Sequence, residues 1–166
     1  MAPLVILGID PGSRITGYGL IAVEGNERSV LDYGVVRAPP VELGRRIRAI
    51  YEGIAAIVAR HVPDEIAIEQ AFVHLNPAVA LALGQARGAA LAAALASERP
   101  LAEYAPRSVK LAIVGSGKAE KIQVAHMIRH LLRIAGPIPE DASDALAIAL
   151  CHAHSRGLAA RMAARA

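Results

Sequence analysis

The stretch Leu4-Val5-Ile6-Leu7-Gly8-Ile9-Asp10-Pro11-Gly12 decides the fold of this 166-residue chain. Residues 4–9 form a continuous apolar run, which is typical of a strand buried on both faces of a sheet. Asp10-Pro11-Gly12 then ends the run with residues that favour a turn. A strand buried on both faces needs helices on both sides, so this stretch predicts an α/β protein with an acidic residue at a strand end.

The residues around this run alternate between strand and helix patterns. Two further strands follow it closely, so the chain is expected to begin with a three-stranded meander. Later strands alternate with helices, which predicts a mixed, partly parallel five-stranded sheet with helices on both faces. We predict strands at 4–9, 16–23, 30–37, 65–69 and 101–104, and helices at 41–60, 77–97, 106–114, 119–134 and from 141 into the tail.

Composition limits the class of protein. The chain is 54% hydrophobic but only 3% aromatic, with a single Phe at position 72. This apolar content excludes intrinsic disorder, and the length suits one domain, expected over residues 1–157, with a tail at 158–166 that frays. One cysteine, Cys151, permits no disulfide within the chain, which fits a reducing compartment.

No targeting or membrane segment is expected. The N-terminus lacks a basic region followed by an apolar one, as a signal peptide would have. The apolar stretch 78–96 is rich in Ala and contains Gln85 and Arg87, so it predicts a packed helix and not a membrane span. We therefore expect a cytoplasmic protein with no membrane association.

Positive charge is concentrated in one segment. The formal net charge is +3, and the only lysines are Lys110, Lys118 and Lys121, close to Arg107. One interpretation is a solvated helix face, and the other is a rim that binds phosphates, with Ser116 and its glycine neighbours as further contacts. Gly115-Ser116-Gly117-Lys118 is not a P-loop, because the first glycine and the Ser/Thr of that motif are missing.

Four acids occupy positions where a sheet exposes functional groups. Asp10 and Glu69 end predicted strands, and Asp141 and Asp144 lie three residues apart at the start of the last helix. If the two strands are parallel neighbours, Asp10 and Glu69 emerge side by side at their carboxyl edge. Taken singly, each acid has a structural explanation, as a turn former, a helix cap or a solvated side chain; no one of these explains all four together.

Carboxylates alone favour a hard metal ion. Oxygen donors suit Mg²⁺, with Mn²⁺ as a substitute, and three or four of them can hold two ions, as in many nucleases. The sequence has no cluster of Cys and His residues that would indicate a zinc site. His126 with His130, and His152 with His154, are interpreted as solvated or DNA-facing side chains.

With these acids and lysines, the sequence resembles the RuvC family of bacterial crossover-junction endodeoxyribonucleases. The resemblance runs from about Leu7 to His154 and rests on several motifs in the same order. They read Leu7-Gly8-Ile9-Asp10-Pro11-Gly12-Ser13-Arg14, Thr16-Gly17-Tyr18-Gly19, Ala67-Ile68-Glu69-Gln70, Leu83-Gly84-Gln85-Ala86-Arg87-Gly88, Val109-Lys110, Gly115, Gly117, Ala119-Glu120-Lys121 and Asp141-Ala142-Ser143-Asp144-Ala145-Leu146-Ala147.

The resemblance implies a single RNase H-like nuclease domain and a homodimer. It implies Mg²⁺-dependent resolution of four-way (Holliday) junctions by paired symmetric nicks that leave 5′-phosphate and 3′-hydroxyl ends, beside the branch-migration proteins RuvA and RuvB. The family's catalytic and metal-binding carboxylates fall on Asp10, Glu69, Asp141 and Asp144.

The resemblance also implies DNA contacts. The family's basic contacts fall on Lys110 and Lys121, and its crossover aromatic falls on Phe72, which is expected to stack on a base. Val73-His74-Leu75 departs from the family's usual Met and nearby Lys, and His74 is a candidate junction contact in this loop. Lys118 also departs from the pattern and is interpreted as an added phosphate contact. The full expected set is Phe72, His74, Arg107, Lys110, Ser116, Lys118 and Lys121.

Three other functions compete with this interpretation. An actin-like ATP-binding protein needs two lobes, which 166 residues cannot supply. A non-catalytic junction-binding scaffold would share the basic rim. A related nuclease acting on RNA would share the carboxylates, and an RNA–DNA hybrid substrate would distinguish it.

Overall fold

The computed structural model describes residues 2–70 and 76–163, with side chains as far as Leu158. Its sheet has the order β3-β2-β1-β4-β5, so β1 lies at the centre. β1 pairs antiparallel with β2 and parallel with β4, while β5 continues the parallel side. The strands are β1 (Leu4–Asp10), β2 (Ile15–Glu24), β3 (Glu27–Arg37), β4 (Glu65–Glu69) and β5 (Leu101–Tyr104).

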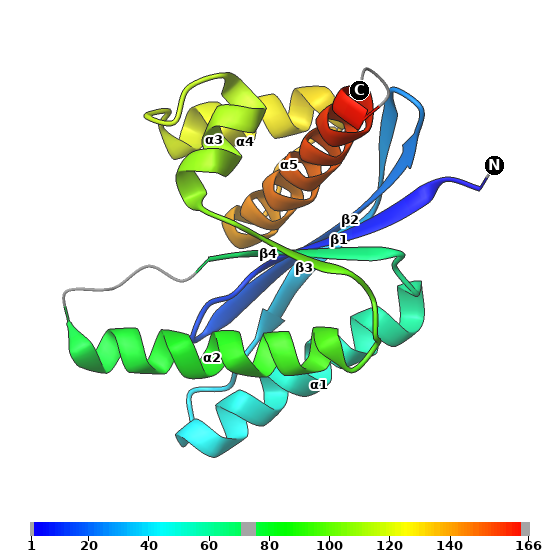
Figure 1. Cartoon of the computed structure of the whole chain (residues 1–166). Coiled ribbons are helices and arrows are strands. Elements are labelled where there is room, and N and C mark those ends of the chain that lie inside the picture. Colours follow the sequence, from blue (N-terminus) through cyan, green and yellow to red (C-terminus); the bar gives the residue numbers. More distant parts are fainter. Residues whose placement is uncertain (1, 71–75, 164–166) are drawn as a thin grey trace.

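Helices cover both faces of this sheet, as Figure 1 shows. One face carries α1 (Leu43–His61) and α2 (Pro77–Leu95), and the other carries α3 (Pro106–Val114), α4 (Lys121–Leu131) and α5 (Glu140–Ala163). Side chains of β1 alternate between the two layers, since Leu7 and Ile9 join the α1/α2 core and Ile6 joins the α3/α4/α5 core. The predicted mixed five-stranded sheet with helices on both faces is confirmed.

Helix α2 packs by only part of its surface. By length and composition alone it could cross a membrane, but its buried side chains, Ala86, Ala89, Ala90, Ala93 and Ala94, belong to the core against α1 and the sheet. Towards its N-terminus, Val79 and Leu81 are exposed, Leu81 by 64%. The helix thus buries alanines in its C-terminal half, while apolar side chains near its N-terminus, and Leu95 at its C-terminus, are exposed to solvent.

Helix α4 is shorter than the predicted span of 119–134. It begins at Lys121 because Glu120 and Gln123 form a capping box, in which the Glu120 N–H donates to Gln123 Oε1 at 2.9 Å. It ends at Leu131, and Arg133 then adopts a positive φ of 52°. The hydrophobic period predicts the helix, whereas its ends are set by the capping box and by the turn at Arg133.

Helix α5 lies directly on the backbone of β1 and β2. Gly8 and Gly19 are paired across these strands, and a Cβ atom on Gly8 would stand 2.1 Å from the Ala145 carbonyl oxygen. A Cβ on Gly17 would stand 1.9 Å from the backbone carbonyl oxygen of Asp141, and Gly17 is paired with Asp10. Glycines therefore set the height of α5 above the sheet, and with it the position of the acids at its start.

We predict that Gly8→Ala lowers the free energy of unfolding by at least about 1–3 kcal/mol, because backbone atoms of α5 cannot yield as a flexible side chain would. Gly84→Ala is the matched control: it lies in α2 with nothing near its Cβ position, so it should leave stability unchanged or raise it by up to about 1 kcal/mol. Urea unfolding of both variants measures this, and equal effects would contradict the close packing.

Candidate active site

The site is built where two parallel strands end side by side. Asp10 is the last residue of β1 and Glu69 the last residue of β4, and the pairing of Ile9 with Ile68 brings these ends together. Alternation places Asp10 on the same face as Gly8, under α5. Glu69 shares its face with Ala67, which belongs to the core on the α5 side. Both carboxylates therefore point towards the start of α5.

Helix α5 brings two more carboxylates to this edge. Asp141 and Asp144 lie in its first turns, and contact between the Asp141 backbone and Gly17 holds that turn beside the end of β1. Burial, together with the negative charges of Glu69, Asp144 and Asp141, raises the pKa of Asp10 to about 7. The structure thus brings together all four acids predicted from the sequence.

Burial is also the main cause that raises the pKa values of Glu69 and Asp144. The charge of Asp144 adds to the effect on Glu69, whereas Lys121 lowers both pKa values. Like charges held together in a half-buried place are unfavourable, so the cluster is poised to accept positive charge.

A cavity of about 220 Å³ lies among these side chains. Asp141 is not among its lining residues, although its charge acts on Asp10. Carboxylates and lysines thus face one small space, closed on one side by α3 and α4. The lining residues are Asp10, Glu69, Pro106, Val109, Lys110, Lys121, Val124, Asp144 and Ala147.

Lys121 supplies the cation nearest to the acids. Its Nζ donates to Asp144 Oδ2 at 3.2 Å and to Glu140 Oε1 at 2.8 Å. These bonds raise the pKa of Lys121 and lower that of Glu140, so both groups remain charged. Glu140 is not among the residues predicted from the sequence, although its place beside Asp141 at the start of a helix is a signal that could have indicated it.

The donor set fits a hard divalent cation. Its oxygens are of the type that Mg²⁺ and Mn²⁺ prefer. Burial and the neighbouring negative charges both raise the pKa of Asp10, and a metal ion would offset those charges. Within residues 2–70 and 76–163, no three His, Cys, Asp or Glu side chains stand in a preformed metal cage. One oxygen of Asp144 instead accepts a hydrogen bond from Lys121.

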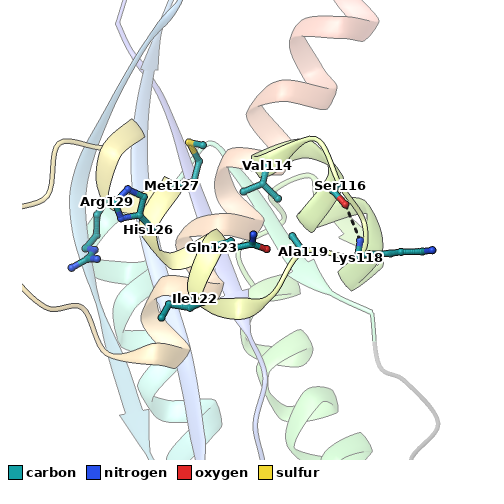
Figure 2. Close-up of a pocket in the computed structure, with 9 residues that line it drawn as sticks. All are labelled: Val114, Ser116, Lys118, Ala119, Ile122, Gln123, His126, Met127 and Arg129. Carbon is teal, nitrogen blue, oxygen red and sulfur yellow. Dashed lines mark hydrogen bonds between the residues drawn. The ribbon is translucent and has the colours of Figure 1, made fainter.

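The remaining predicted contacts lie apart from the acids. Ser116 and Lys118 line a hollow of about 670 Å³ on the outer side of α4, with Ile122, His126 and Arg129 (Figure 2). No carboxylate lines this hollow, so the larger depression is not where acid chemistry would occur. The Lys118 N–H donates to Ser116 Oγ at 3.3 Å, a bond that shapes the loop before α4.

Arg107 belongs with this loop, because its side chain lies over Gly117. The capping box engages the N–H groups of Glu120 and Gln123 at the start of α4, and the phosphate contact expected at Ser116 stays a prediction. Lys110 instead lines the carboxylate cavity. Phe72 and His74 lie outside the described residues, and their roles stay predictions.

One histidine was misinterpreted. His152 is not solvated: its ring bonds the Tyr104 hydroxyl at 2.8 Å and Glu65 Oε2 at 2.7 Å, and only 12% of its side chain is exposed. Arg156 joins the same Glu65 carboxylate through two contacts of 2.7 and 2.9 Å. This network ties the middle of α5 to β4 and β5, a contact between distant segments that local spacing did not indicate.

Comparison with known proteins gives the family of this chain. The family model described as crossover junction endodeoxyribonuclease RuvC matches residues 6–152. The crossover junction endodeoxyribonuclease RuvC of Halorhodospira halophila is 52% identical over 152 residues, which cover 91% of this chain and 90% of the relative.

Solved structures give the same result. The structure of Thermus thermophilus RuvC in complex with Holliday junction substrate is similar with a TM-score of 0.88 at 35% identity, covering 94% of this chain and 96% of that one. The yeast mitochondrial Holliday junction resolvase Ydc2 is similar with a TM-score of 0.68 at 12% identity, over 92% and 78% of the two chains, which shows the fold alone. The expected RNase H-like fold is confirmed, and the chain belongs to the RuvC family of crossover junction endodeoxyribonucleases.

Proposed function

We propose that this protein is a structure-selective endonuclease that resolves four-way DNA junctions in recombination and repair. The observation that carries the proposal is the meeting of Asp10, Glu69, Asp141 and Asp144 at one sheet edge, with Lys110 and Lys121 in the same cavity. The relative from Thermus thermophilus, solved with a Holliday junction substrate, supports the choice of DNA substrate. We propose paired symmetric nicks that leave 5′-phosphate and 3′-hydroxyl ends.

The four carboxylates would hold Mg²⁺, two ions in our proposal, with Mn²⁺ as a substitute. Bound there, the metal supplies an activated water and stabilises the leaving 3′ oxygen. Asp10 and Glu69 contribute ligands from the sheet, and Asp141 and Asp144 contribute them from α5. Because Asp10 retains a proton up to about pH 7 in the metal-free protein, its ionisation accompanies metal binding.

Lys121 has two roles in this proposal. Without metal it neutralises Asp144 and Glu140. With Asp144 engaged as a metal ligand, the Lys121 ammonium group would be free to contact a phosphate of the junction. Lys110 lines the same cavity and adds a second phosphate contact, whereas Arg107, Ser116 and Lys118 extend the basic surface along the loop before α4.

The expected assembly is a homodimer, since two nicks related by symmetry need two sites related by symmetry. The exposed apolar end of α2, with Val79 and Leu81, is a suitable contact for a second copy. We place the enzyme in the cytoplasm, without membrane attachment, beside RuvA and RuvB. We also propose residues 1–157 as the nuclease domain and 158–166 as a short C-terminal tail, the first part of which continues α5.

Asp10→Asn should bind a synthetic mobile four-way junction with unchanged affinity and lose cleavage activity by more than about 100-fold. Substitution of a residue that only supports a metal ligand already costs up to about 100-fold in activity, so loss of a ligand itself should cost more. The phosphate contacts remain in this variant while one proposed metal ligand is lost. Gel assays with Mg²⁺ measure both quantities, with linear duplex and an RNA–DNA hybrid as control substrates. Normal cleavage by the variant would refute the carboxylate site.

The same substitution should stabilise the metal-free protein at neutral to alkaline pH. Folding raises the pKa of Asp10 from 3.8 to about 7, so its contribution to stability is full below pH 3.8 and is lost as pH rises towards 7. At about pH 8, Asp10→Asn should therefore raise Tm by about 3–8 °C. Near pH 4 the difference should disappear.

Thermal unfolding in a metal chelator measures this effect. Glu52→Gln, an exposed acid on α1, controls for the loss of one negative charge and should change Tm little. A lower Tm for Asp10→Asn at alkaline pH would show that the Asp10 carboxylate is stabilising as it stands.

Lys121→Ala should weaken junction binding and reduce the slope of log affinity against log salt by about one unit, as the loss of one phosphate contact requires. Arg48→Ala is the control, because this exposed arginine lies in α1 on the opposite side of the sheet. Binding measured over a salt series in the presence of Ca²⁺ decides the matter. An unchanged slope would confine Lys121 to its ion pairs with Asp144 and Glu140.

A further inference from the structure

Arg87 of α2 makes contacts at the end of β4, and the proposed function gives it no role as a metal ligand or a phosphate contact. Its Nε donates to the backbone carbonyl oxygen of Glu69 at 3.1 Å, and its guanidinium forms an ion pair with the carboxylate of Glu103 on β5. Only 17% of the Arg87 side chain is exposed. A charged side chain that is mostly removed from water needs such partners, so the arrangement is specific.

These contacts reach the strand ends from the face opposite to the carboxylate cavity. Glu103 is paired with Ile68, whose side chain packs in the core beneath α1 and α2. Alternation therefore directs the Glu103 side chain towards α2 and the Glu69 side chain towards α5. Arg87 thus holds the main chain of Glu69 from one side while its carboxylate projects from the other.

The Glu69 peptide lies where the regular ladder with β1 stops. The parallel pairing of β1 and β4 ends at Ile9 with Ile68, one residue earlier. Beyond it, the Gln70 N–H donates to the Tyr104 carbonyl oxygen at 2.9 Å, and the Glu69 carbonyl accepts from Arg87. Two hydrogen bonds from different elements therefore fix the orientation of this peptide, and so the direction in which the Glu69 side chain leaves the chain.

We propose that Arg87 is a positioning residue that fixes Glu69 for metal binding through the backbone of β4. This inference rests on the proposed role of Glu69 as a metal ligand. The cations that act on the Glu69 carboxylate are Lys121 and Lys110, so the contribution of Arg87 is geometric. A planar guanidinium makes both bonds at once, whereas a lysine at this position can satisfy them only in part.

Arg87→Met removes the donor and keeps much of the apolar stem. We expect the Kd for Mn²⁺, measured by titration calorimetry on the DNA-free protein, to rise about tenfold, and the maximal cleavage rate to fall about 10–100-fold. Junction affinity in a metal chelator should stay within about twofold of wild type, since the side chain faces away from the cavity. Arg87→Lys should recover part of the Mn²⁺ affinity.

Glu103→Gln is the matched variant, because it weakens the hold on Arg87 without touching the bond to Glu69. It should shift the Kd for Mn²⁺ in the same direction by a smaller factor, and it carries the test if Arg87→Met does not fold. Wild-type Mn²⁺ affinity in a folded Arg87→Met protein, or a loss of junction affinity that parallels the loss of cleavage, would overturn the proposal. If wild type does not cut junctions, the proposed function fails, while the Mn²⁺ affinities still decide the role of Arg87.

Discussion

The close contact between α5 and the backbone of β1 and β2 is the constraint on which the site depends. No room is left for a side chain between the sheet and α5 at Gly8, Gly17 and Gly19. The distance of α5 from the sheet and its position along the strands are therefore fixed. Asp10 comes from the sheet, and Asp141 and Asp144 come from the helix. Their meeting is therefore a result of main-chain packing, which is stiffer than any contact between long side chains.

This packing concentrates negative charge, and the fold tolerates it by two means. Burial and repulsion keep a proton on Asp10 up to about pH 7, and Lys121 neutralises Asp144 from α4. In the proposed function, a metal ion would replace both the proton on Asp10 and the ammonium group beside Asp144. In this respect the carboxylate cluster is unlike the His152, Tyr104 and Glu65 network, whose members satisfy one another and hold α5 against β4 and β5.

Much of this could be predicted from the sequence, and the reasons are local. A continuous apolar run such as 4–9 predicts a central strand, and acids at strand ends and three apart on a helix predict a shared edge. Pairings between side chains far apart in the chain have no local signal: Arg87 with Glu69, Lys121 with Glu140, and His152 with Glu65 each needed the folded chain. The predicted start of α4 is wrong for a different reason. The capping box that begins this helix is made of polar side chains, which a hydrophobic period does not reveal.

The sheet also separates two kinds of surface. Its α5 face holds the acids and the lysines of the cavity, and its α1/α2 face carries the exposed apolar end of α2. A substitution at Leu81 therefore changes the exposed apolar surface of α2 and leaves the carboxylate cavity unaltered. A substitution at Lys110 changes the cavity and leaves that surface unaltered. Arg87 spans this division, because it belongs to α2 and holds the main chain of Glu69, whose carboxylate projects from the other face.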